Sequence, residues 1–167
     1  MINEDKKRYG LSNLGLIKGL FTGHAFYAVL HYRIASWLYK HHIKLLPDMV
    51  CYRNIRRHGC EISPTSSIDG GLMLHHTVGI VVGCFVKAGK NLEIFQNVTI
   101  GSNRKEVDGQ IMPIIGDNVS IGSGAVVVGP IKIGNNVLIG ANSYVDKDIP
   151  DNAVVAGIPA KIIRYKQ

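Results

Sequence analysis

Residues 115–145 read IGDNVSIGSGAVVVGPIKIGNNVLIGANSYV, with an aliphatic residue at every sixth position. The same spacing runs through the preceding part of the chain. Together these positions are Ile62, Ile68, Leu74, Ile80, Val86, Leu92 and Val98, then Ile115, Ile121, Val127, Ile133, Ile139 and Val145. A period of six matches neither the 3.6 of a helix nor the 2 of a simple strand. It is typical of a parallel β-helix, in which each hexad forms one side of a coil. We therefore predict a mainly β protein built as a parallel β-helix.

Strand alternation predicts a second inward position in each hexad, four residues after the aliphatic one. That position is small or apolar in many hexads: Ser66, Val78, Cys84, Ser102, Ala125, Val137 and Ser143. Lys90 and Gln96 break the rule and indicate distorted corners. The residue directly after the aliphatic one often suits a tight turn, as at Asp69, Gly116, Gly122, Gly134 and Gly140. Three hexads close one coil, with successive coils stacked about 4.8 Å apart.

Two features interrupt this scaffold. The step from Val98 to Ile115 is one residue short of three hexads, and this slip predicts a loop over 102–112. The other feature is the pair His75-His76, directly after an inward leucine. The outside of a β-helix is a flat ladder, so reactive groups must come from corners or loops. We expect the loop and the histidines to approach each other within a subunit or across a subunit boundary.

Residues 1–58 carry a helical pattern and precede a β-helical domain over 59–167. Apolar residues recur at spacings of three and four: Leu11, Leu14, Ile17 and Phe21, then Tyr27, Leu30, Ile34, Trp37 and Leu38. Gly23 and Leu46-Pro47-Asp48 predict breaks. We predict two or three helices that cap the open end of the β-helix. Peripheral membrane contact through aromatic and basic residues is the alternative.

Composition limits the class of protein. The chain has 167 residues, 46% hydrophobic and 19% charged, which suits a globular domain. Its net charge of +7 fits nucleic acid, anionic lipid or a phosphorylated small molecule. We find no nucleic-acid motif and expect no such partner. Cys51, Cys60 and Cys84 lack metal-site spacing, so we predict no metal and reduced thiols in the cytoplasm. No apolar stretch follows Met1 directly and no apolar run has membrane length, so we expect neither a signal peptide nor a membrane span.

Several stretches together resemble a known family. Residues 72–83, LMLHHTVGIVVG, resemble the catalytic segment of serine O-acetyltransferases, and residues 97–101, NVTIG, resemble their next coil. Residues 139–143, 145–150 and 156–161 are similar to the ending shared by hexapeptide-repeat acyltransferases. The resemblance covers residues 30–165. It implies a left-handed β-helix, a homotrimer, and acetyl-CoA bound in the groove between neighbouring prisms.

The resemblance also implies residue roles. His76 falls on the general base, which removes the proton of an attacking hydroxyl. Glu61 falls on the acidic residue that orients this base. His75 replaces the aspartate that normally precedes the base and is a third catalytic candidate. The matches for the pantetheine arm of acetyl-CoA are Gly101, Ser123 and Ala141, and those for its phosphates are Lys147, Lys161 and Arg164.

The loop departs from the serine-specific pattern. Serine acetyltransferases carry an Arg-His pair before the proline that ends the loop, where this chain has Ile111-Met112. Arginine is a natural partner for a carboxylate, and isoleucine is not. The loop also lacks a second glycine after Gly101, and the helical segment is short. We therefore predict acetyl transfer to a sugar hydroxyl in surface polysaccharide synthesis. The alternatives are serine O-acetylation in cysteine synthesis and a non-catalytic structural β-helix.

Overall fold

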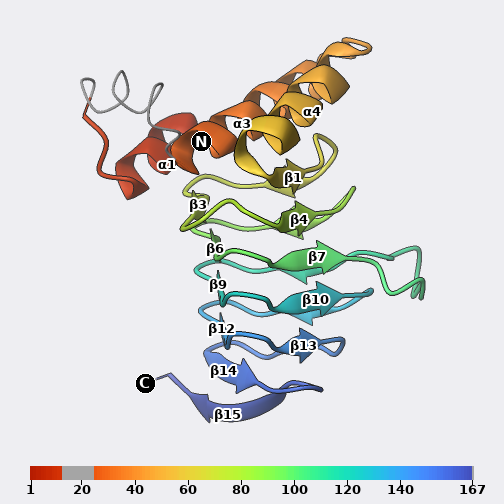
Figure 1. The fold of residues 1–167 in the computed structure, drawn as a ribbon. Helices are drawn as coiled ribbons and strands as arrows, with labels where there is room; N and C mark the ends of the chain where they lie inside the picture. Colours follow the sequence, from red (N-terminus) through yellow and green to blue (C-terminus); the bar gives the residue numbers. More distant parts are fainter. Residues whose placement is uncertain (13–24, 167) are drawn as a thin grey trace.

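A computed structural model describes residues 1–12 and 25–166, with the helices at one end of a stack of short strands (Figure 1). The helices described are α1 Ile2–Arg8, α3 Ala25–Lys40 and α4 Leu46–His58. The first strands are β1 Cys60–Ile62, β2 Ser67–Ile68, β3 Met73–Leu74, β4 Ile80–Val82, β5 Lys87–Ala88, β6 Glu93–Ile94, β7 Thr99–Gly101 and β8 Ile114–Ile115. They are followed by β9 Ser120–Ile121, β10 Val126–Val128, β11 Lys132–Ile133, β12 Leu138–Ile139, β13 Tyr144–Val145, β14 Ala153–Ala156 and β15 Lys161–Tyr165.

The strands form three walls around one core. We name these walls sheet A (β1-β4-β7-β10-β13), sheet B (β2-β5-β8-β11) and sheet C (β3-β6-β9-β12-β14-β15). All pairings are parallel except that of β14 with β15. The chain visits the sheets in the order A, B, C and then returns to A, which confirms the predicted parallel β-helix. The antiparallel β15 covers the last coil.

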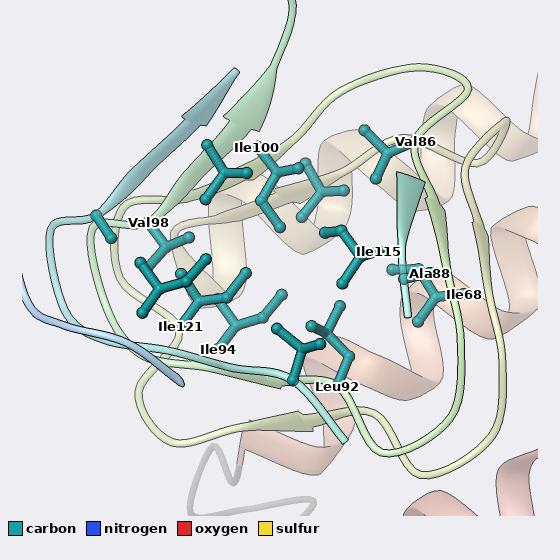
Figure 2. Packing of buried hydrophobic residues seen from close by; sticks show 14 of the residues in the cluster. Ile68, Val86, Ala88, Leu92, Ile94, Val98, Ile100, Ile115 and Ile121 are labelled. Carbon is teal, nitrogen blue, oxygen red and sulfur yellow. The ribbon is translucent and has the colours of Figure 1, made fainter. Parts of the chain in front are cut away.

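All thirteen predicted hexad positions lie inside the prism, each with at most 3% of its surface exposed. Figure 2 shows how side chains from the three walls meet, among them Ile100 of sheet A, Ile115 of sheet B and Ile94 of sheet C. Burying an aliphatic side chain of this size stabilises a fold by about 1.5–3 kcal/mol. The core is therefore a continuous column, to which every coil contributes.

The predicted unbroken phase from Ile62 to Val98 is wrong. The step from Met73 to its partner Glu93 is two residues longer than the step from Ser120 to its partner Leu138. Two extra residues therefore lie between β3 and β4. The sequence conceals them because the second inward position of each hexad lies four residues after the aliphatic one and therefore two residues before the next aliphatic one. A shift of two exchanges one inward position for the other and leaves the aliphatic period intact.

This hidden shift explains the irregular second inward positions. Ser66, Ala125, Val137 and Ser143 are buried, as predicted. Val78, Cys84 and Ser102 are exposed instead, and Lys90 is exposed with them. These residues belong to coils read in the wrong phase, so Lys90 and Gln96 do not mark distorted corners.

The loop between β7 and β8 is longer than the single slip indicates. Ile100 and Ile115 occupy equivalent positions in sheets A and B, yet the step between them exceeds the hexad of a regular corner by nine residues. The loop projects beyond the end of β7 (Figure 1) and folds back on itself through two backbone hydrogen bonds between Val107 and Gln110, of 3.0 and 2.8 Å. The chain therefore leaves the coil at this edge and returns to it.

The predicted helical cap is confirmed, and it includes a helix, α1, that begins before the apolar pattern. α3 buries a face through Val29, Tyr32 and Ala35 and leaves Ile34 and Trp37 exposed. The positions Leu14, Ile17, Phe21 and Gly23 lie outside the described residues. No helix in the described part of the chain has the length and apolarity of a membrane span.

A buried ion pair closes the helical end of the stack. Asp5 of α1 is fully buried and pairs with Arg33 of α3 at 2.8 Å. The Asp5 carboxylate also accepts hydrogen bonds from the backbone N–H groups of Gly71 and Leu72, both at 2.8 Å. Arg33 donates to the carbonyl of Asp69 at 2.7 Å. The first coil has no coil before it, so these side chains satisfy backbone groups that would otherwise be buried without partners.

Candidate active site

The two inserted residues are His76 and Thr77. His75 lies over Phe95, because its N–H bonds to Ile94 as the N–H of Phe95 bonds to Ile121 in the next coil. The carbonyl of Val78 likewise occupies the place that the carbonyl of Gln96 takes one coil later. Nothing separates residues 95 and 96, so His76 and Thr77 bulge out of the edge between sheets C and A. The candidate base is therefore exposed because the coil is locally too long to lie flat.

His75 has a different environment from its neighbour. Its ring stacks on Phe95 with centroids 4.0 Å apart and planes 12° apart. Its Nε2 lies 3.7 Å from a carboxylate oxygen of Glu93, whose other oxygen pairs with Arg8 of α1. His75 thus belongs to the wall that supports the bulge.

Tyr9 holds the strand just before the histidines. Its hydroxyl accepts a hydrogen bond from the N–H of Leu74 at 2.6 Å and donates one to the Leu74 carbonyl at 3.0 Å. Burial raises the pKa of Tyr9, since an apolar environment disfavours the charged phenolate. The phenol therefore stays protonated and can donate. We call the corner at His75 and His76 the histidine corner. The Tyr9 hydroxyl joins the segment after α1 to this corner.

Glu61 lies on the outer face of β1 and is exposed. Among the described residues, no ion pair joins Glu61 to His76. Its orienting role stays a prediction.

The remaining candidates divide between two edges of the prism. Ser123 and Ala141 lie on the same edge as His76, between sheets C and A, and they are stacked, since Asn142 donates its N–H to the Ser123 carbonyl at 2.8 Å. Gly101 and Lys147 lie on the edge between sheets A and B, where the long loop leaves the coil. Sheet A separates the two edges, so a single chain does not bring the loop to the histidines.

The basic residues Lys161 and Arg164 lie on β15, at the end of the stack farthest from the helices, and both are exposed. At Gly101, an added Cβ would meet no atom within 4 Å. The backbone there is open, and the role of Gly101 in binding pantetheine stays a prediction.

A hollow of about 490 Å³ lies at the foot of the loop. Its lining includes Ile111 and Met112, the pair that stands in place of Arg-His, together with Phe85, Lys87 and Asp108. Lys87 and Asp108 were not singled out from the sequence, because an outward lysine on a strand and an aspartate in a polar loop carry no local signal. Within residues 1–12 and 25–166 we find no group of three metal-ligating side chains.

Comparison with known proteins gives a consistent answer. A family described as Bacterial transferase hexapeptide (six repeats) matches residues 112–147. Serine acetyltransferase of Synechococcus elongatus is 36% identical over 83% of this chain and 56% of its own length. Serine acetyltransferase of Bacillus pumilus is 35% identical over 88% of this chain and 67% of its own length. The chain thus spans little more than half the length of the first of these relatives.

Solved structures agree. The crystal structure of Neisseria gonorrhoeae serine acetyltransferase superposes with a TM-score of 0.86 and 34% identity, covering 99% of this chain and 64% of that one. A Brucella abortus serine acetyltransferase in complex with coenzyme A gives a TM-score of 0.79 and 34% identity over 85% of this chain and 56% of its own. These matches support the left-handed hand of the β-helix.

The comparisons correct the predicted acceptor. The prediction of a sugar hydroxyl in polysaccharide synthesis is wrong, because the similar proteins at 35–36% identity are serine acetyltransferases. The prediction rested mainly on one missing arginine. A carboxylate is bound by charge placed in three dimensions, and a cation from another strand can stand in for one absent from the loop.

Proposed function

Because the chain belongs to the hexapeptide-repeat transferases that include the serine acetyltransferases, we propose that it transfers the acetyl group of acetyl-CoA to the hydroxyl of L-serine. The observation that carries this proposal is the similarity to serine acetyltransferases along nearly the whole chain, with 99% of it superposed on one of them. The two-residue bulge that exposes His76 supports it, because a transfer to an alcohol needs an accessible base.

In the proposed reaction, His76 takes the proton of the serine hydroxyl as the oxygen attacks the thioester carbonyl. The new ester C–O bond forms and the C–S bond breaks. The CoA thiolate then takes the proton from the imidazolium, and O-acetylserine and CoA leave. Imidazole suits both steps because it exchanges a proton near neutral pH. We propose Glu61 as the residue that orients His76, and His75 as a support for the corner.

We propose that the complete site forms in a homotrimer. One chain holds His76, Ser123 and Ala141 on one edge and the loop with Gly101 on another. A threefold arrangement sets the first edge of one subunit against the second edge of its neighbour. Acetyl-CoA would lie in this groove, with its arm along Gly101, Ser123 and Ala141. Its phosphates would contact the basic residues Lys147, Lys161 and Arg164. We place this enzyme in the cytoplasm, where its free cysteines stay reduced.

The test measures the release of CoA from acetyl-CoA in the presence of L-serine. A thiol reagent detects the free CoA, and mass spectrometry identifies O-acetylserine. We expect saturation with serine in the micromolar to millimolar range. Light scattering should give about three times the 18.3 kDa of one chain. If a trimer that binds CoA releases none with L-serine, the proposed acceptor is wrong. A monomer that turns over serine would refute the shared groove.

A further inference from the structure

The hollow at the foot of the loop has a fixed floor. Gln110 donates from its side-chain amide to the carbonyls of Met112, at 3.1 Å, and Ile131, at 3.2 Å. The Met112 methyl lies close to Gly83, 3.5 Å from where a Cβ would stand there. The backbone N–H of Lys87 donates to the Pro113 carbonyl at 3.3 Å. The inner half of the loop is therefore attached to the prism, and the hollow exists before any ligand arrives.

Two opposite charges face this hollow without pairing. Lys87 lines it from β5 and Asp108 lines it from the loop. Within the described residues, neither side chain forms an ion pair. An isolated surface charge is ordinary. A cation and an anion that line one hollow and stay apart leave room for a ligand that carries both charges.

The position of Lys87 matters for the departure in the loop. Ile111 offers no charge for a carboxylate, yet it lines the same hollow as Lys87. Lys87 pairs in register with Ile114, three residues beyond Ile111. A cation thus remains beside the position of the missing arginine, but it comes from the wall of the coil.

We propose that Lys87 binds the α-carboxylate of the acceptor amino acid and that Asp108 binds its ammonium group. This inference rests on the proposed function, since it concerns the acceptor of that reaction. It makes Lys87 a specificity-determining residue, with the hydroxyl of the bound acceptor directed toward His76 of a neighbouring subunit.

The experiment compares K87M with K132M in the full chain. Methionine keeps much of the apolar length of lysine and removes the charge. Lys132 is a matched control, because it is exposed on the same sheet, on the other side of Ile114. We expect K87M to raise the KM for L-serine about 10–100-fold, in line with a lost charge-assisted contact. The KM for acetyl-CoA and all constants of K132M should stay within twofold. The wild type should prefer L-serine to L-serinamide, and K87M should not.

Direct binding separates this inference from the proposed function. L-Serine binding to the CoA-bound protein is measured by NMR for the wild type and K87M. If the wild type fails to acetylate serine, the proposed function falls, yet at least tenfold weaker serine binding by K87M still supports the pocket. Equal binding by both proteins overturns the inference. So does a K87M defect confined to acetyl-CoA, because Lys87 would then contact a phosphate.

Discussion

The coil is interrupted at two edges, and the two interruptions are built differently. The histidine corner gains two residues and is held from outside by Tyr9, which bonds both backbone groups of Leu74. The long loop gains nine residues, and its tip is closed mainly by bonds between Val107 and Gln110. The short, buttressed insertion presents a candidate reacting group, whereas the long one forms a wall of the hollow at its foot.

The largest effect should come from removing the side chain at the short insertion. We expect H76A to lower kcat for serine acetylation about 10²–10⁴-fold, the usual contribution of a general base. Because His76 is exposed, the melting temperature of H76A should match that of the wild type. H42A, which alters an exposed histidine in the helical cap, is the control. Unchanged CoA release by H76A would remove His76 from the mechanism.

Shortening the long insertion tests the other half of the comparison. Deleting residues 103–111 leaves Ile100 and Ile115 one hexad apart, which restores a regular corner. The stack should remain folded and trimeric, since loop length has a small effect on stability. Serine turnover should fall about 10–100-fold, because Asp108 and the wall of the hollow are lost. Circular dichroism and light scattering check the fold, and an unfolded product would show that the loop is structural.

Acid should destabilise the corner at His75 and His76 more than it destabilises the loop. His58 ends α4, one residue before Gly59, whose carbonyl accepts the N–H of Gly79 at 2.9 Å. Burial lowers the pKa of His58 to about 4, with a further contribution from nearby His31. In the unfolded chain His58 has an ordinary histidine pKa near 6.5. Between about pH 6.5 and 4 the unfolded chain therefore binds a proton at His58 and the folded chain does not. The free energy of unfolding is thus not reduced by His58 above about pH 6.5, and it decreases as the pH drops toward 4.

We expect this loss to be on the order of 2–3 kcal/mol for one histidine. Urea unfolding between pH 7 and 4 measures it, and the hydrogen-exchange protection of residues 75–80 should fall more over this pH range than that of residues 102–112. H58Q should flatten the dependence, whereas H41Q, which alters an exposed histidine, should leave it as in the wild type. The same pH slope in H58Q would assign the effect to other groups.

The smallest effect should come from removing the Tyr9 hydroxyl, which supports the strand before the histidines. Y9F removes both hydrogen bonds to Leu74 and should cost about 1–3 kcal/mol, because two backbone groups lose their partner. Y39F alters an exposed tyrosine and should stay within about 0.5 kcal/mol. We also expect Y9F to lower kcat more than it raises the KM for serine. If kcat is unchanged at full folding, Tyr9 supports the fold but does not position the base.

The comparison also shows what the sequence could reveal. The aliphatic period predicted the prism correctly, because a fully buried position such as Ile121 requires an apolar residue. It concealed the insertion after Leu74, because Ile80 and Val82 are both aliphatic and both inward. The pair His75-His76 was found from the sequence, although the insertion that begins at His76 and exposes it was not.

Other features had no local signal at all. The pair of Asp5 and Arg33 joins two helices far apart in the chain, and nothing near either residue indicates burial. The acceptor was mispredicted largely from Ile111, because the charges that line the same hollow come from a different strand and from the loop tip. The charges that line a binding hollow come from segments far apart in the sequence, and a linear motif contains only one of these segments.

The buried Asp5 has a consequence for the order of folding. Its backbone partners, Gly71 and Leu72, follow 66 and 67 residues later in the chain. At about 5–20 residues per second, a ribosome needs roughly 3–13 s to supply them. Until then the first helix has no place to dock, and its carboxylate remains hydrated. The cap therefore closes after the first coil exists, so it should slow unfolding of the finished protein more than it accelerates folding.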